Sequence, residues 1–461
     1  MCYKQQLKAH RLLLKANRMT TQQNIGTHTF RTPFGNILAL KENGVIKAKS
    51  IRYARSERYK LPVPLETIEL SEEITDKIPV CPQNISPFLE RLIGKTDLEK
   101  FQPDESTQFL TITRPENFVE NEKLPVIVWI HGGSYEIGCG DLPTSDPTVW
   151  VKEQNIIVVA VSYRLGIFGF LGGDKNRPAN LGLFDIIEAL KWIQKNIRSF
   201  GGNPENITLF GQSSGGDAIA HLMISEGVEN LFHRAIIHSA PLGFRLKRQK
   251  MSSDFFRNTE FLKDEKDVLK MTESYTGFLP TVFKYGLKAS MPFCLQYGHP
   301  PLCREEKSLE KWRENAKKYD VLIGSNHDET AFYVKTAEEG IYTYLPERIL
   351  NRIVRSTTKS IYEKPAHLFA ENYAKDGGNI YVFKIDLKIK NNYIGTSHCV
   401  DLPLIFENKE AWKSAELLKD VPWEYLQKNG KKFRTLWAEF ATNGKISDNS
   451  EKPEILALRK V

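Results

Sequence analysis

The sequence is poor in cysteine, and its cysteines are not spaced as in redox-active pairs or zinc sites. Among its 461 residues are Cys2, Cys81, Cys139, Cys294, Cys303 and Cys399. No two of them form a CxxC pair, and no spacing is typical of a zinc site. With no export signal before them, we expect these thiols to be reduced and the protein to be cytoplasmic. The sequence predicts no metal and no cofactor.

Long apolar runs are also absent. Near the start of the chain the longest is Leu12–Leu14, which is far too short for the apolar region of a signal peptide. Elsewhere no run approaches the ~20 apolar residues of a membrane span. We therefore predict no membrane span.

The chain lacks repeats, low-complexity tracts and linkers rich in proline, serine or glycine, so we predict one large domain over residues 21–461. The net charge is +8. Five of these charges are Lys4, Lys8, Arg11, Lys15 and Arg18. Without them the net charge is 8 − 5 = +3, which gives a nucleic-acid partner no support.

Residues 1–20 are expected to form a basic, disordered extension. Two alternatives stay open for this segment. It is a targeting or membrane-surface segment, or translation truly begins at Met19.

Continuous apolar runs dominate the first half of the remaining chain. They lie at 126–130, 156–161, 207–210 and 235–237, and the amphipathic stretch 183–197 has helical period. Such runs separated by helices predict an α/β fold whose mainly parallel central sheet carries helices on both faces. Residues 242–319 are rich in charged and aromatic residues, without an obvious strand, and predict a helical cap. Later strands are expected at 321–323 and 380–385.

Gly211-Gln212-Ser213-Ser214-Gly215 stands between an apolar strand and a helix. A G-x-S-x-G in that context predicts the nucleophile elbow of a serine hydrolase of the α/β-hydrolase fold. The nucleophile is then Ser213, at the centre of the motif. The His131-Gly132-Gly133-Ser134 sequence directly after strand 126–130 predicts the loop that lends N–H groups to an oxyanion hole.

The acid and the base of such a site follow the serine in chain order. Asp328 and Glu329 both follow the strand at 321–323, and spacing does not choose between them. Among the histidines after Ser213, only His398 lies on a loop beyond the strand at 380–385. It is the predicted base.

Several motifs together resemble the type-B carboxylesterase family, which includes the bacterial para-nitrobenzyl esterases. The resemblance runs from about residue 30 to about residue 445. Besides the elbow, the His131 loop and the Asp328-Glu329 pair, it rests on residues 81–83, 162–170, 180–185, 200–204 and 398–403. It implies an α/β-hydrolase fold and a Ser-Glu-His triad, with Glu329 as the acid.

The resemblance also implies roles for the residues around the triad. The oxyanion donors fall on Gly133, Ser134 and Ser214. Supporting positions fall on Gly132, Gln212, Ser239 and Asp401, of which Ser239 and Asp401 match a buried network near the histidine.

Two departures from the family have consequences. Gln212 stands where the family usually has glutamate, so we expect neutral, fairly apolar esters rather than cationic ones. Thr107 stands where the family has the disulfide partner of Cys81, so that bridge is not expected.

The predicted function is hydrolysis of small-molecule carboxylic esters through an acyl-enzyme. An amidase, carbamate hydrolase or acyltransferase with the same triad is the alternative. A non-catalytic neuroligin-like binding protein is a remote one, because Ser213 is retained. The sequence predicts neither the natural ester nor the oligomeric state.

Overall fold

The computed structural model describes residues 26–67, 78–97, 100–117, 119, 122–337, 341–389 and 392–461. The extension predicted at 1–20 lies outside these ranges. Within them, no helix is both long enough and apolar enough to cross a membrane.

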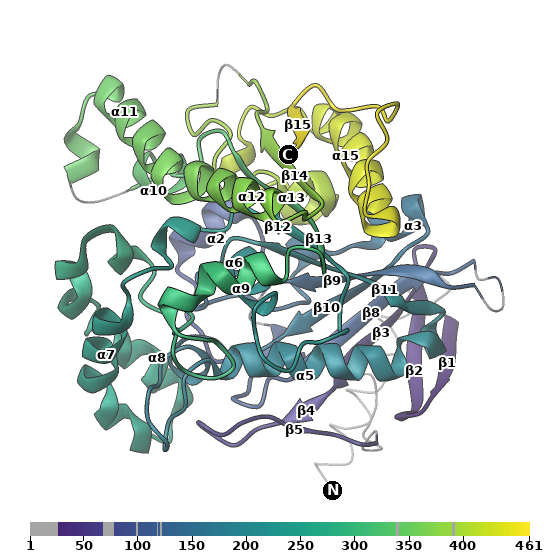
Figure 1. The fold of residues 1–461 in the computed structure, drawn as a ribbon, viewed down its shortest axis with the longest axis horizontal. Helices are drawn as coiled ribbons and strands as arrows, with labels where there is room; N and C mark the ends of the chain where they lie inside the picture. The colour runs from purple at the N-terminus through teal and green to yellow at the C-terminus, as the bar shows by residue number, and fades with distance from the viewer. Residues whose placement is uncertain are drawn as a thin grey trace, which may run out of the picture.

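An eleven-stranded sheet forms the centre of the molecule, with strand order β1-β2-β3-β8-β10-β9-β11-β12-β13-β14-β15 (Figure 1). Its strands are β1 Gly26–Thr32, β2 Gly35–Glu42, β3 Val45–Arg52, β8 Phe109–Pro115, β9 Leu124–Ile130, β10 Ile157–Ser162, β11 Gly202–Gln212, β12 Arg234–His238, β13 Asp320–Asn326, β14 Ile380–Ile385 and β15 Leu456–Lys460. The strands from β10 to β14 in this order are parallel, and antiparallel strands flank them on both sides. Two small sheets pair β4 Ala54–Arg55 with β5 Val63–Pro64 and β6 Pro79–Val80 with β7 Gln102–Pro103.

Helices cover both faces of the sheet. The α-helices of the described residues are α2 Pro87–Ile93, α3 Thr148–Gln154, α4 Gly166–Gly169, α5 Leu181–Asn196, α6 Ser214–Leu222, α7 Gln249–Asn258, α8 Val268–Thr276, α9 Ser308–Glu314, α10 Ala331–Val334, α11 Glu347–Thr358, α12 Lys364–Lys375, α13 Leu402–Ile405, α14 Lys409–Trp412 and α15 Trp423–Asn443. The predicted helix at 183–197 is α5, which a 3-10 turn at Ile197–Phe200 extends.

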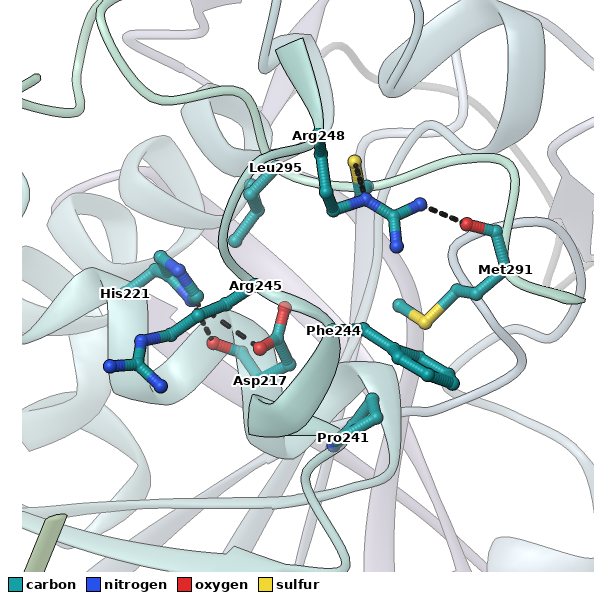
Figure 2. Close-up of a pocket in the computed structure, with 9 residues that line it drawn as sticks. Asp217, His221, Pro241, Phe244, Arg245, Arg248, Met291 and Leu295 are labelled. Carbon is teal, nitrogen blue, oxygen red and sulfur yellow. Dashed lines mark hydrogen bonds and ion pairs between the residues drawn. The ribbon is translucent and has the colours of Figure 1, made fainter. Parts of the chain in front are cut away.

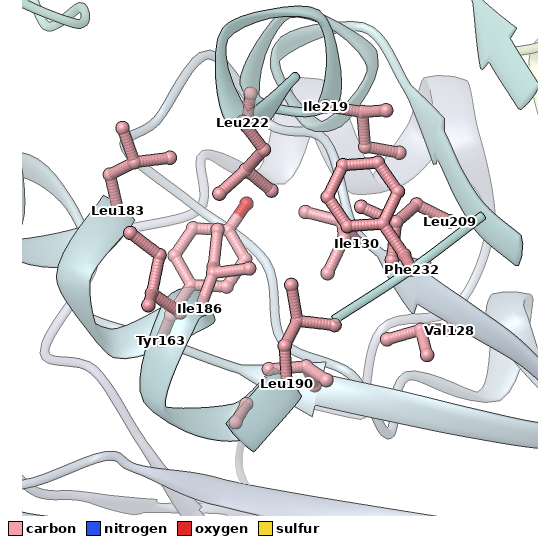
Figure 3. Packing of buried hydrophobic residues seen from close by; sticks show 14 of the residues in the cluster. Val128, Ile130, Tyr163, Leu183, Ile186, Leu190, Leu209, Ile219, Leu222 and Phe232 are labelled. Carbon is pink, nitrogen blue, oxygen red and sulfur yellow. The ribbon is translucent and has the colours of Figure 1, made fainter. Parts of the chain in front are cut away.

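Successive side chains of β9 point to opposite faces of the sheet, which explains why its sequence is apolar throughout. Val128 and Ile130 face one core with α5 and α6 (Figure 3), whereas Ile127 and Trp129 face a second core with α3 and α15. Since successive strand residues point to opposite faces, a strand covered on both sides needs apolar residues at every position. The predicted α/β-hydrolase architecture is confirmed.

The segment between β12 and β13 contains the range 242–319 and is described throughout. It holds α7, α8 and α9, together with 3-10 turns at Leu242–Phe244, Glu260–Asp264, Leu279–Ser290 and Glu305–Lys307, and no strand. Helices α7 and α8 lie beside the sheet at one side of the molecule (Figure 1).

Candidate active site

Ser213 lies at the sharp turn between β11 and α6. Its backbone has φ 57° and ψ −127°, a conformation that costs a non-glycine residue free energy and is typical of functional turns. The flanking glycines are required sterically. A Cβ on Gly211 would lie 2.6 Å from the carbonyl carbon of Gly215, and one on Gly215 would collide with the carbonyl oxygen of Ile130.

Hydrogen bonds hold this turn to the neighbouring strand. The Ser213 N–H donates to the carbonyl of His238, at the end of β12, at 2.9 Å. Because β11 and β12 are parallel and pair Gln212 with His238, the serine stands at the carboxyl edge of the sheet.

His398 and Glu329 meet in the interior beside this edge. The distance from His398 Nδ1 to Glu329 Oε2 is 2.5 Å, and both side chains are buried. The second oxygen, Oε1, accepts the Asn326 N–H at 2.6 Å, and the His398 N–H donates to the Glu329 carbonyl at 3.1 Å. The carboxylate and the imidazole are therefore fixed in one relative orientation.

Asp328 has different partners. Its Oδ1 lies 3.0 Å from His327 Nδ1, and its Oδ2 accepts the Thr396 N–H at 3.2 Å. Asp328 closes the loop that carries His398 but does not bind the imidazole of His398. Of the two acids that the spacing left open, Glu329 is the one that faces His398.

Gln212 occupies the other nitrogen of His398. Its Nε2 lies 3.2 Å from His398 Nε2 and 3.6 Å from Cys399 Sγ. Since Nδ1 carries the proton that faces Glu329, Nε2 is a lone-pair acceptor and the Gln212 amide donates to it. Among the described residues, no hydrogen bond joins His398 to the Ser213 hydroxyl. Such a bond is often formed only when substrate is bound.

The loop after β9 packs directly on the elbow. A Cβ on Gly132 would lie 2.7 Å from the Gln212 carbonyl oxygen and 3.0 Å from Ser213 Cβ. Gly133, Ser134 and Tyr135 all have positive φ, of 108°, 57° and 60°. The Tyr135 N–H donates to the Ser214 hydroxyl at 3.1 Å. The Ser214 side chain thus anchors the loop.

Three backbone N–H groups near Ser213 make no hydrogen bond within the described part of the chain. They belong to Gly133, Ser134 and Ser214. Ser214 is also the first residue of α6, where N–H groups have no partner in the helix and favour negative charge.

His131 supports the start of the same loop. Its Nδ1 lies 2.8 Å from the Gly132 carbonyl oxygen, and its ring stacks on Tyr163 at 4.4 Å between centroids. Burial lowers the pKa of His131 to about 4. Its imidazole is therefore neutral at pH 7.

We expect His131 to make the fold sensitive to acid. The unfolded chain binds a proton at His131 with a pKa of about 6.5, whereas the folded chain binds it only near pH 4. This contribution to the free energy of unfolding is complete above pH 6.5 and falls by about 3 kcal/mol down to pH 4. Urea unfolding of the wild type and His131→Gln across this window measures it. The variant should lose less stability over the window, and parallel pH profiles would contradict the assignment.

A second buried carboxylate lies behind the triad residues. Asp401 Oδ2 lies 2.6 Å from His238 Nδ1, and its Oδ1 accepts the Asn326 amide at 3.0 Å. Trp437 Nε1 donates to His238 Nε2 at 2.7 Å. Burial raises the pKa of Asp401, but the hydrogen bonds from His238 and Asn326 and the electrostatic attraction of His238 together outweigh burial, so this pKa is below its usual value.

The structure does not join Ser239 to Asp401 in the buried network that the resemblance implied. The Ser239 hydroxyl is buried without a hydrogen-bond partner among the described residues, and Asp401 binds His238 and Asn326 instead. The sequence interpretation missed His238, Asn326 and Trp437. Strand register, which pairs His238 with both Gln212 and Gly324, is the signal that places His238 at this edge.

No three His, Cys, Asp or Glu side chains gather as a possible metal site in the ranges that the structure describes. The arrangement is instead that of a nucleophile, a histidine, a carboxylate and free N–H donors, which suits acyl transfer.

Comparison with known proteins identifies the family. Residues 31–343 match the model of the carboxylesterase family. A probable N-octanoylanthranilate hydrolase of Rhodococcus erythropolis is 30% identical, with 86% of this chain and 89% of the relative covered. The para-nitrobenzyl esterase of Bacillus subtilis is 28% identical, with 90% of each chain covered. The solved structure of a thermophilic PNB esterase is similar in fold, with a TM-score of 0.77, 24% identity and coverage of 94% of this chain and 97% of that one. The chain belongs to the carboxylesterase family.

Proposed function

We propose that this family member hydrolyses carboxylic esters, with Ser213 as nucleophile, His398 as general base and Glu329 as the acid that orients it. The observation that carries the proposal is the 2.5 Å contact between His398 Nδ1 and Glu329 Oε2. It fixes the imidazole with its proton on Nδ1, so that Nε2 carries the lone pair that can accept a proton.

In the first half of the reaction, Ser213 Oγ attacks the ester carbonyl carbon while His398 Nε2 takes its proton. The carbonyl oxygen becomes an oxyanion. The alkoxy group then leaves as an alcohol, with the proton returned by His398, and an acyl-serine remains. In the second half, His398 deprotonates a water that attacks the acyl-serine. The carboxylic acid leaves and Ser213 regains its proton.

The oxyanion would bind the N–H groups of Gly133, Ser134 and Ser214. The support is that these donors lie beside Ser213 and have no partner among the described residues. Their positions are set by the strained loop and by the anchor from Tyr135 to the Ser214 hydroxyl. Preorganised donors of this kind lower the barrier because they need no reorientation as charge develops.

Gln212 would have to release His398 Nε2 before the serine is attacked. Its amide donates to the lone pair that must take the Ser213 proton. A modest shift of the Gln212 side chain on substrate binding exchanges one hydrogen bond for another, so the cost is small. We assign Gln212 a positioning role, and Gly132 the role of close packing against the elbow. Asp401 supports the site by binding Asn326, and we give the unpartnered Ser239 hydroxyl no part in the reaction.

We further propose that residues 242–319 act as a cap over the ester-binding site and that the protein is cytoplasmic. The cap is supported by its helices between β12 and β13. The location is supported by free thiols at all five described cysteines, including the buried Cys81, Cys139 and Cys294.

An N-acyl amide is the second candidate substrate, because the 30%-identical relative is named a hydrolase of N-octanoylanthranilate. Matched p-nitrophenyl esters and p-nitroanilides of butyrate and octanoate decide between the two. We expect higher kcat/KM for the esters. Faster hydrolysis of the anilides would show that the protein is an amidase rather than an esterase. No turnover of either substrate class would contradict the proposal.

The choice of Glu329 as acid gives a direct prediction. Glu329→Gln should lower kcat by about 10³- to 10⁴-fold, because the imidazole loses the carboxylate that fixes its tautomer and stabilises its cation. Asp328→Asn removes a negative charge from the neighbouring position and should cost about tenfold or less, since Asp328 binds only His327 and the His398 loop. Steady-state kinetics with p-nitrophenyl butyrate compare the two. The reverse ranking would make Asp328 the acid.

A further inference from the structure

Asp217 is a buried carboxylate in the first turn of α6, close behind the nucleophile Ser213. Its side chain is 5% exposed. Figure 2 shows it beside His221 on the same helix, at the edge of a small pocket. Asp217 Oδ1 lies 3.6 Å from His221 Nδ1, which is closer to the Asp217 carbonyl oxygen, at 2.7 Å. Burying a carboxylate is costly unless hydrogen bonds compensate it, so its donor is informative.

Tyr135 supplies that hydrogen bond. Its hydroxyl lies 2.7 Å from Asp217 Oδ2, and both side chains are buried. Burial, followed by the charge of Asp217 and the hydrogen bond to it, raises the pKa of Tyr135 well above its usual value. The hydroxyl therefore keeps its proton and is the donor. Within the described ranges, no other hydrogen bond reaches the Asp217 side chain.

Tyr135 is also fixed through its backbone and its ring. Its N–H donates to the Ser214 hydroxyl at 3.1 Å, and its carbonyl accepts the Gly166 N–H at 2.6 Å. The ring packs on Phe170 at 4.3 Å between centroids. A bulky residue keeps a φ of 60° only where its surroundings over-determine it. The bond to Asp217 holds the far end of the side chain.

The turn that contains Tyr135 aims one of the proposed oxyanion donors. The Glu136 and Ile137 N–H groups donate to the Gly133 carbonyl at 2.9 and 3.0 Å. This carbonyl shares a planar trans peptide with the Ser134 N–H, which points the opposite way. The hydrogen bonds of the turn therefore orient the Ser134 N–H, and the position of Tyr135 sets where the turn lies relative to the elbow.

The backbone of Asp217 orients the donor of the elbow in the same way. Its N–H donates to the Ser213 carbonyl at 2.9 Å, and that carbonyl shares a peptide plane with the Ser214 N–H. Asp217 thus holds the Ser214 N–H through its backbone and the turn of Tyr135 through its carboxylate. One residue connects the two segments that supply the proposed oxyanion donors.

We propose that Asp217 and Tyr135 are positioning residues that align the N–H donors of the loop after β9 with the N–H donor of the elbow. The inference rests on the proposed function. Such donors must match the position of the oxygen in the transition state closely. The ground-state carbonyl depends on them less. Loss of the link should therefore lower kcat much more than it raises KM.

Steady-state kinetics with p-nitrophenyl butyrate test this inference. Tyr135→Phe and Asp217→Ala each remove the hydrogen bond and should lower kcat by about 10- to 100-fold, with KM within about threefold of wild type. Asp217→Asn keeps an oxygen that accepts the Tyr135 hydroxyl, so its kcat should stay within about fivefold of wild type. The double variant Tyr135→Phe/Asp217→Ala should be no slower than the slower single variant, because both residues form one link.

Tyr373→Phe is the matched control. Tyr373 is as buried as Tyr135, and its hydroxyl donates to the Tyr319 carbonyl at 2.9 Å. Tyr319 directly precedes β13, so this bond lies at the opposite edge of the sheet from Ser213. The control should lower Tm and leave kcat unchanged. Unchanged kcat in Tyr135→Phe would overturn the inference, and so would equal losses of kcat in Asp217→Asn and Asp217→Ala.

The rate of labelling by a fluorophosphonate separates this inference from the proposed function, because attack by Ser213 places charge on the phosphonyl oxygen without any ester. If the wild type hydrolyses no ester, the proposed function fails. Labelling about tenfold slower in Tyr135→Phe would then still support the link, whereas equal rates would overturn it. No labelling of the wild type would overturn both.

A second variant covers a failure of Asp217→Ala or Tyr135→Phe to fold. The double variant Tyr135→Phe/Asp217→Ala removes the hydroxyl and the carboxylate together, so no buried charge is left without its donor. It should show the same loss of kcat. Wild-type kcat in the folded double variant would overturn the inference.

Discussion

Ser213→Ala is expected to lower kcat for p-nitrophenyl butyrate by about 10⁶-fold, with only residual hydrolysis from the remaining groups. The physical reason is that no acyl-enzyme forms without Oγ, since the methyl group of alanine is no nucleophile. The fold should survive. Ser213 is only 7% exposed, but the group that ties the elbow to β12 is its backbone N–H, which alanine keeps.

Ser214→Ala is the matched control, one residue along the same turn. The Ser214 hydroxyl accepts the Tyr135 N–H, so its loss should loosen the oxyanion loop and cost about ten- to a hundredfold in kcat, far less than loss of the nucleophile. A fluorophosphonate should label the wild type and Ser214→Ala but not Ser213→Ala, as read by mass spectrometry. Labelling that persists in Ser213→Ala would show that another serine is the nucleophile.

His398→Ala should have an effect of similar size, with kcat lowered by about 10⁵- to 10⁶-fold, because no group remains to take the Ser213 proton. His238, another buried histidine near this edge, does not replace it. His238 Nδ1 faces Asp401, and its Nε2 accepts the Trp437 indole N–H. Both nitrogens of His238 are occupied, so it has no lone pair to offer.

The double variant Ser213→Ala/His398→Ala gives a sharper test than either single change. Residues that act as one unit are not additive, so the double variant should be no slower than the slower single variant. His327→Ala is the control, because its ring is half-exposed and binds Asp328 rather than Glu329. Near-normal turnover by His398→Ala would show that chain order identified the wrong histidine.

The local features of the fold were predictable from the sequence because they depend on neighbours in the chain. Apolar residues at every position of 126–130 and 156–161 require cover on both faces, and this gives parallel central strands. The need for glycine in the elbow was predictable for the same reason. A Cβ at Gly211 or Gly215 collides with backbone a few residues away or on the adjacent strand. Chain order and the G-x-S-x-G pattern were sufficient to propose Ser213 and His398.

Contacts between distant segments were decided only by the tertiary structure. Asp328 and Glu329 are adjacent and chemically alike, and only the path of the loop at 395–398 makes Glu329 the partner of His398. Asp401 pairs with His238 rather than Ser239 because strand register brings β12 beside the loop after β14.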